Sequence, residues 1–111
     1  MEAVNLSHCG RHYEISYDEY GDVLYVVSPE SRASTQTRTD DDGFQWRLSR
    51  NDARPSGFTV LDFNYNWQYK PDSLIQRIEK GMECNQFLAR RFVEIIISVS
   101  YGRMKSDEEL F

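Results

Sequence analysis

Hydrophobic and polar residues follow a two-residue period near the start of the chain. Residues 13–17 alternate between apolar and polar side chains, which is the pattern of a half-buried β-strand. Residues 23–27 form a continuous apolar run of strand length, and the polar segment 18–22 separates the two. Gly21 can adopt a positive φ without a Cβ clash. The pattern therefore predicts a β-hairpin at the start of the fold.

Similar signals continue through the middle of the chain. Residues 31–39 are polar and predict either a loop or a solvent-facing edge strand. The Asp-Asp-Asp-Gly sequence at 40–43 is a strong turn signal, and the alternation at 44–49 predicts another strand. Residues 51–57 contain Arg-Pro-Ser-Gly, which predicts a second turn region before a strand at 58–63.

The run from Phe63 to Tyr69 alternates strictly between aromatic and amide residues. As a strand it would place four aromatic side chains on one face and three amides on the other. Such a face could be a stacking platform for a sugar or a base. An aromatic sheet face covered by a helix is the favoured interpretation, because aromatic residues supply much of the buried area in a small core.

The remainder of the chain predicts two helices. Pro71 suits the first turn of a helix capped by Asp72 or Ser73, and Gly81 suits its end. Residues 93–101 fit a helix face but also alternate like a strand rich in β-branched residues. Helix is chosen there, because no Gly, Pro or Asn interrupts the sequence from residue 86 to residue 101.

Together these elements predict an α+β fold. We expect an antiparallel β-meander of four or five strands with two helices packed on one face. Residues 1–111 are expected to form a single domain, with the meander at 12–69 and the helical part at 71–105. Residues 106–111 are expected to fray.

Composition places the chain among globular proteins, with 40% hydrophobic and 28% charged residues in 111. The formal net charge is −5, and the acidic excess lies in residues 1–66, which argues against a nucleic-acid partner. No apolar run reaches the length of about 18 residues that suggests a membrane span. Two distant cysteines and the absence of a signal-like N-terminus predict a cytoplasmic protein with reduced thiols and no membrane partner.

One segment resembles a known family. Residues 17–26 read Tyr-Asp-Glu-Tyr-Gly-Asp-Val-Leu-Tyr-Val, which is similar to the Tyr-Asp-x-x-x-Asp-x-Leu-Tyr-Ile hairpin of the small bacterial proteins grouped as domain-of-unknown-function family 2283. That family also has a later Asp-Gly turn and a strand of the type Val-x-Ile-Leu-Asp, matched here by residues 42–43 and 58–63. The resemblance covers about residues 12–63. It implies a compact antiparallel meander and supplies no catalytic residue.

Several clusters could carry metal or cofactor chemistry. His8, Cys9 and His12, with Cys84 as a fourth ligand, include the residue types of zinc sites, but their spacing matches no standard pairing. A polar N-terminal segment is the favoured interpretation. The three aspartates at 40–42 could hold a cation but are better explained as a solvated turn. No metal and no cofactor are therefore predicted.

The sequence evidence for catalytic groups is similarly weak. Asp18, Glu19 and Asp22 could form an acid/base pair, although turn residues are commonly acidic for local hydrogen bonding. The second half of the chain is locally basic, and nucleic acid or an acidic partner could use such a patch, which consists of Arg77, Lys80, Arg90, Arg91, Arg103 and Lys105. Glu79, Glu83 and Glu94 are interspersed among these residues, so a solvated mixed surface is the favoured interpretation. No catalytic residue is predicted, and both cysteines are expected to be reduced. Cys84 is expected to fill a small space in the core.

These observations predict a non-enzymatic interaction module that forms a homodimer or binds a protein partner. The exposed sheet face or the C-terminal helix would supply the self-complementary surface. The alternative is a small-ligand-binding protein or a weak hydrolase. It would use Tyr65, Trp67 and Tyr69 as a pocket floor and Asp62 as the polar anchor.

Overall fold

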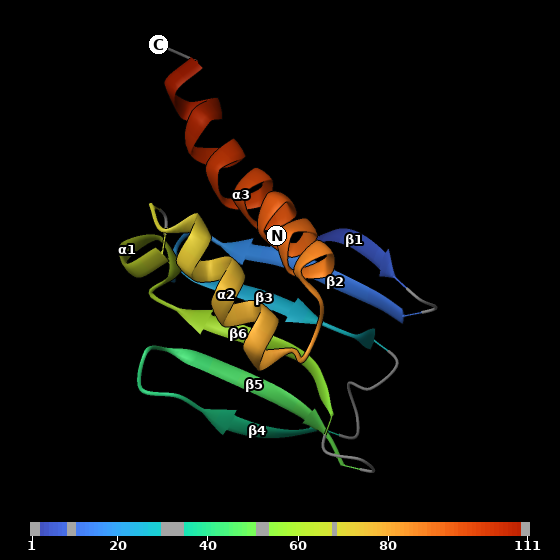
Figure 1. The fold of residues 1–111 in the computed structure, drawn as a ribbon. Helices are drawn as coiled ribbons and strands as arrows, with labels where there is room; N and C mark the ends of the chain where they lie inside the picture. Colours follow the sequence, from blue (N-terminus) through green and yellow to red (C-terminus); the bar gives the residue numbers. More distant parts are fainter. Residues whose placement is uncertain (1–2, 9–10, 30–34, 51–53, 68, 110–111) are drawn as a thin grey trace.

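Six strands form one antiparallel sheet, and three helices follow them in the chain (Figure 1). The computed structural model describes residues 3–8, 11–29, 35–50, 54–67 and 69–109. The strands are β1 (Ala3–His8), β2 (Arg11–Asp18), β3 (Val23–Val27), β4 (Thr35–Thr39), β5 (Phe44–Ser49) and β6 (Pro55–Leu61). The helices are α1 (Phe63–Trp67), α2 (Pro71–Gly81) and α3 (Gln86–Glu109).

The sheet consists of two three-stranded meanders joined side by side. Its order is β1-β2-β3-β6-β5-β4, so β3 and β6 pair where the two meanders meet. This arrangement confirms the predicted α+β class with an antiparallel sheet, although the strand count is six rather than four or five. The alternation at the N-terminus is too short to predict β1, in which Leu6 is buried and faces Tyr13 of β2.

Helices α2 and α3 lie over the same face of the sheet (Figure 1). The alternating apolar residues of β2 are buried beneath them, and Tyr13 meets Phe92 of α3 edge to face, with ring centroids 5.0 Å apart. Helix α2 is placed by a close approach between Gly81 and Trp46 of β5. A Cβ atom at Gly81 would overlap the Trp46 indole, so the glycine lets the helix end directly on the ring.

Strand β6 begins earlier than the sequence predicts. Pro55, Ser56 and Gly57 belong to the strand rather than to a turn. The register shifts between Arg47 and Leu48, and Pro55 lies opposite Leu48 beyond this bulge. A proline without an N–H is tolerated at such an irregular strand end. Gly57 is required in the strand because a Cβ there would overlap the carbonyl of Val26 in β3.

The strand interpretation of residues 63–69 is wrong. Phe63–Trp67 is the short helix α1, and it turns the chain away from β6 toward α2. Asp62, at the junction, has a φ of 51°, a left-handed conformation that ends the strand. The local alternation of aromatic and amide residues is compatible with a strand, and contacts from outside the segment impose the helix.

The two longer helices match the predicted segments. Residues 93–101 are helical as expected, and Asn85 caps α3 by accepting the Leu88 N–H at 2.9 Å. Helix α3 continues through residues 106–109, beyond the predicted end at 105. Helix α2 starts at Pro71 without a side-chain cap, so neither Asp72 nor Ser73 has the predicted capping role. No helix in the described part of the chain is long and apolar enough to cross a membrane.

Candidate functional site

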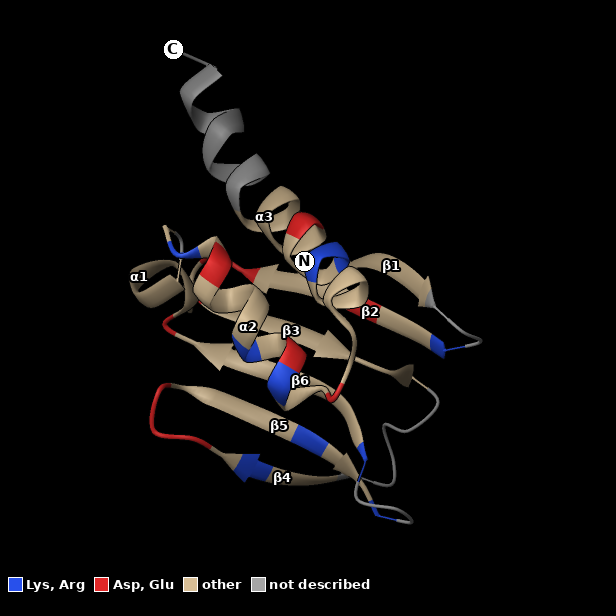
Figure 2. Ribbon diagram, viewed as in Figure 1, with Lys and Arg blue, Asp and Glu red and all other residues tan. Residues whose placement is uncertain are grey.

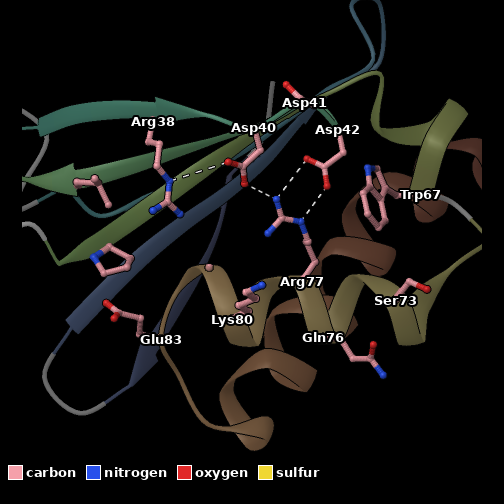
Figure 3. A pocket seen from close by; sticks show the side chains of 13 residues that line it. Arg38, Asp40, Asp41, Asp42, Trp67, Ser73, Gln76, Arg77, Lys80 and Glu83 are labelled. Carbon is pink, nitrogen blue, oxygen red and sulfur yellow. Dashed lines mark hydrogen bonds and ion pairs between the residues drawn. The ribbon is translucent and has the colours of Figure 1, made fainter.

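A broad open depression lies between helix α2 and the β4–β5 hairpin, where the helical layer stops short of the sheet edge (Figure 3). Its volume is about 1100 Å³. Side chains from the hairpin, from α1 and from α2 line it: Arg38, Asp40, Asp41, Asp42, Leu48, Pro55, Trp67, Ser73, Gln76, Arg77, Lys80, Gly81 and Glu83. We refer to this depression as the α2 groove.

The turn between β4 and β5 supplies the acidic wall of the α2 groove (Figure 2). The Asp40 N–H donates to the Phe44 carbonyl at 2.8 Å, and the Gly43 N–H donates to the Asp40 carbonyl at 3.3 Å. Gly43 has a φ of 90°, which a side-chain-bearing residue rarely adopts. The Asp-Asp-Asp-Gly sequence therefore forms a tight, well-defined turn that presents Asp40 and Asp42 toward α2 (Figure 3).

Arg77 of α2 is held by both of these aspartates. Its Nε atom donates to Asp42 at 2.8 Å, and its Nη2 atom donates to Asp40. The guanidinium also lies over the rings of Phe44 and Trp46, with centroid distances of 5.2 Å and 5.4 Å. Hydrogen bonding to Asp42 and Asp40 raises the pKa of Arg77 despite its partial burial. Arg77 thus fastens α2 to the hairpin.

Asp40 has a second, uncharged partner. The indole Nε1 of Trp46 donates to Asp40 Oδ2 at 2.7 Å. This hydrogen bond, followed by the one from Arg77, lowers the pKa of Asp40. Arg38 of β4 approaches the same carboxylate at 4.0 Å. We refer to Asp40, Asp42, Trp46 and Arg77 as the hairpin clamp, because together they connect the sheet to α2.

Trp67 forms another part of the α2 groove wall (Figure 3). Its ring meets Phe44 edge to face, with centroids 5.2 Å apart. The Trp67 Nε1 atom is buried and has no hydrogen-bond partner in the described part of the protein. A buried indole N–H normally finds an acceptor. This N–H could donate a hydrogen bond to an acceptor atom of a bound molecule.

A further acidic residue, Asp22 in the turn between β2 and β3, forms hydrogen bonds at the same end of the strands as the β4–β5 turn. Its side chain accepts hydrogen bonds from the Tyr17 hydroxyl at 2.8 Å, the Asn64 N–H at 2.7 Å and the Tyr65 N–H at 3.2 Å. It therefore caps α1 from 42 residues away. Burial, and then the hydrogen bond with Asp22, raises the pKa of Tyr17. Asp22 rather than Gly21 takes the positive φ in this turn, at 55°.

The four predicted ligand-binding residues do not form one site. Trp67 lines the α2 groove, whereas Asp62, Tyr65 and Tyr69 are not among its lining residues. Tyr65 and Tyr69 are 89% and 84% exposed, and Asp62 is exposed at the end of β6. Helix α1 separates Tyr65 from Trp67, because residues two apart lie on different sides of a helix rather than on one strand face.

Of the residues considered for a zinc site, His12 lies in β2 and Cys84 lies between α2 and α3. His12 Nδ1 lies 2.7 Å from the Ser7 hydroxyl oxygen in a hydrogen bond between β1 and β2. Cys84 follows α2, is half-buried and packs against the core, and burial raises the pKa of its thiol. Cys9 lies outside the described residues. Within those residues, no group of three or more His, Cys, Asp or Glu side chains could hold a metal ion.

Comparison with known proteins gives no relative. No family model matches the chain, and no curated protein or solved structure matches it. The resemblance of residues 12–63 to domain-of-unknown-function family 2283 stays a prediction.

Proposed function

We propose that this protein is a non-enzymatic interaction module that acts as a homodimer. The observation that carries this proposal is that three acidic side chains form hydrogen bonds within the fold. Asp22 binds two backbone N–H groups and Tyr17, and Asp40 and Asp42 bind Arg77. Carboxylates held in this way fix the positions of α1, α2 and the hairpin, and so they build a rigid surface for a partner.

The open face of the sheet supports the same proposal. The two long helices cover the opposite face (Figure 2). Tyr25 and Val27 of β3 are half-buried on the open face, and Leu61 of β6 is 39% exposed. An antiparallel sheet can leave one such face in water, and a mixed aromatic and aliphatic surface suits contact with a protein.

The molar mass in solution tests the homodimer. We expect sedimentation velocity over a range of protein concentrations to show a species of twice the 13.1 kDa chain mass that increases with concentration. A mass of 13.1 kDa at every concentration would contradict the proposal.

The proposal extends to a bacterial cytoplasmic location, without membrane or nucleic-acid partners. Cys84 is a free thiol packed against the core, which suits a reducing compartment. The net charge of −5 disfavours a phosphate backbone as partner. The bacterial source rests on the family resemblance alone.

A second candidate function is the binding of a small ligand in the α2 groove. The buried, unpartnered Nε1 of Trp67 favours it, because a ligand acceptor would satisfy that donor. The hydrolase form of this alternative would place Asp62 in the groove, but Asp62 is not among the lining residues. We therefore retain only the binding form.

Native mass spectrometry of the purified protein tests the second candidate. We expect a non-covalent adduct that is lost in Trp67→Phe, which keeps a ring but removes the donor, and retained in Tyr69→Phe. An adduct-free wild type, or an adduct that survives Trp67→Phe, would contradict ligand binding at Trp67.

A further inference from the structure

In the part of the chain that the structure describes, strand β4 is an edge of the sheet and no helix lies over it (Figure 1). Its residues Gln36, Thr37, Arg38 and Thr39 are all exposed. The strand pairs with β5 through five consecutive residue pairs without a register shift, and it contains no proline. Sheet edges are commonly blocked by proline, by a bulge or by inward-pointing charge. Strand β4 has neither a proline nor a bulge, and its one charged residue, Arg38, lies 4.0 Å from the Asp40 carboxylate.

The hydrogen bonds of the hairpin show which backbone groups of β4 are free. The Asp40 N–H donates to the Phe44 carbonyl, so these two residues form a hydrogen-bonded pair at the turn. Hydrogen-bonded and non-hydrogen-bonded pairs alternate along an antiparallel ladder. Arg38 and Gln36 therefore direct their N–H and C=O groups toward β5. Thr35, Thr37 and Thr39 direct theirs outward, away from the sheet.

This alternation makes β4 self-complementary. When two copies of β4 pair antiparallel about Thr37, each Thr37 exchanges both of its backbone hydrogen bonds with the other Thr37. Thr35 of one copy pairs with Thr39 of the other in the same way, so every outward-facing group of the strand is satisfied. The two-fold axis required by a symmetric dimer passes through the Thr37 pair.

The side chains fit the same register. Gln36 and Arg38 lie on the helix-covered side of the sheet, in register with Leu48 and Trp46 of β5. In the pairing about Thr37, Gln36 of each copy lies opposite Arg38 of the other, in the closely spaced type of pair. A register centred on Arg38 would instead place two arginines opposite each other, which is unfavourable.

The other edge of the sheet is less suited to a second copy. Strand β1 lies beneath α3, which packs on both β1 and β2. Helix α3 also runs past this side of the sheet (Figure 1). A second chain that approaches β1 therefore meets the helix, whereas β4 is accessible from both faces.

We propose that two copies of this chain join β4 to β4 in antiparallel register about Thr37. The two six-stranded sheets then form one continuous sheet, with the open faces of both copies on the same side. This inference rests on the proposed homodimer and names its interface.

The substitution Thr37→Pro tests the pairing. It removes an N–H that points away from β5, so the hairpin keeps its internal ladder, and proline is tolerated at such edge positions. Each dimer loses two intermolecular hydrogen bonds, and we expect the dimer dissociation constant to rise by about tenfold or more. Thr37→Val keeps the N–H and serves as the matched control, with a dissociation constant close to that of wild type.

Gln36 provides a second test that leaves the backbone unchanged. Gln36→Glu places a carboxylate opposite Arg38 and should strengthen the dimer, with the gain reduced at high salt. Gln36→Arg places like charges opposite each other and should weaken it. Sedimentation velocity gives the dissociation constants, and circular dichroism shows that each variant is folded.

The outcomes separate the two proposals. Weaker dimers for Thr37→Pro and Gln36→Arg with a stronger dimer for Gln36→Glu support the β4 interface. If Thr37→Pro does not fold, the two Gln36 variants decide the question. A wild-type dimer whose dissociation constant is unchanged by the Gln36 variants would overturn the β4 interface and leave the homodimer. A wild type that stays monomeric would overturn both.

Discussion

At the scale of single residues, Asp22 and Arg77 each hold together segments that are far apart in the sequence. Asp22 joins the β2–β3 turn to α1, and Arg77 joins α2 to the β4–β5 turn. Hydrogen bonds with a charged partner are stronger than neutral ones. Removing one partner leaves a partly buried polar group unsatisfied, which lowers the free energy of unfolding. A few such side chains therefore contribute strongly to the arrangement of the elements.

The substitution Asp22→Asn tests the cap on α1. Asparagine tolerates the left-handed conformation at this position, so the change mainly removes the charge that binds Tyr17 and the two N–H groups of α1. We expect the free energy of unfolding to fall by about 1–3 kcal/mol in urea titrations. The pKa of Tyr17, followed by ultraviolet absorbance, should move down toward its ordinary value.

Glu19→Gln is the control for this measurement, because Glu19 is exposed in the same turn. It should change the free energy of unfolding by no more than about 0.5 kcal/mol. Equal effects of the two substitutions would show that Asp22 does not have the capping role assigned to it.

The hairpin clamp predicts a loss of stability in acid. The pKa of Asp40 is lower in the folded protein than the ordinary value of 3.8, because Trp46 and Arg77 donate hydrogen bonds to the carboxylate. As the pH falls through 3.8, the unfolded chain binds a proton at Asp40 that the folded protein does not, and the folded state loses this stabilisation. The contribution is fully present above that pH.

Urea titrations between pH 7 and pH 3 measure this effect. We expect Asp40→Asn to be less stable than wild type at pH 7 and to lose less stability on acidification. Asp41→Asn is the control, since Asp41 is exposed in the same turn and is not bound to Arg77 in the described contacts. A parallel pH dependence of wild type and Asp40→Asn would contradict the role of Asp40.

At the scale of elements, α2 depends on a small residue at its end. Gly81→Ala adds a methyl group that overlaps the Trp46 indole, and Trp46 is fully buried and cannot move freely. Despite the better helix propensity of alanine, we expect the free energy of unfolding to fall by about 1–3 kcal/mol, the usual cost of overpacking. Urea titrations measure the change, and the near-ultraviolet circular dichroism of Trp46 should change with it.

Gly21→Ala is the matched control for Gly81. A Cβ there would lie 3.0 Å from Asp18 Oδ2, the far end of a half-buried side chain, and no backbone atom or ring lies as close. We expect a much smaller effect than at Gly81. If Gly81→Ala is as stable as wild type, the close approach of α2 to Trp46 is not a constraint on the fold.

The elements also show what sequence patterns can and cannot predict. Periodicity predicts β2, β5 and α2, because each buries a regular face of its own residues. A continuous apolar run predicts β3, and the absence of helix breakers from residue 86 to residue 101 predicts α3. Periodicity fails at 63–69, where the local alternation fits a strand but the distant carboxylate of Asp22 caps a helix. The sequence pattern also does not predict β1, in which Leu6 is buried.

The candidate site is less predictable than the fold. The sequence points to Trp67 as an aromatic lining residue, but it indicates only a solvated turn at 40–42 and a mixed surface around Arg77. Arg77 is 35 residues from Asp42 and 37 residues from Asp40 in the sequence. No local sequence pattern predicts that this helix position contacts this turn. An arginine on the half-buried side of a predicted helix is the one available signal.

At the scale of the whole molecule, the sheet has two edges with different properties. The helical layer lies toward β1, and the α2 groove and the bare strand β4 lie toward the other edge. A dimer through β4 would leave the α2 groove of each copy beside the two-fold axis. The hairpin clamp would then stabilise the same hairpin that carries the interface.

This arrangement predicts that thermal stability depends on protein concentration. A dimer of folded chains is favoured over unfolded monomers by mass action. Above the dissociation constant, each tenfold increase in concentration should stabilise a chain by about 0.7 kcal/mol, half of the tenfold free-energy step per dimer. For a domain of this size the melting temperature should rise by about 3 °C per tenfold increase. Thr37→Pro, whose dissociation constant should be about tenfold or more higher, should begin this rise at a concentration higher by the same factor. Scanning calorimetry or circular dichroism over a hundredfold concentration range gives both curves. A melting temperature that rises equally in wild type and Thr37→Pro would place the dimer interface away from β4, because the proline removes only an outward-facing donor of that edge.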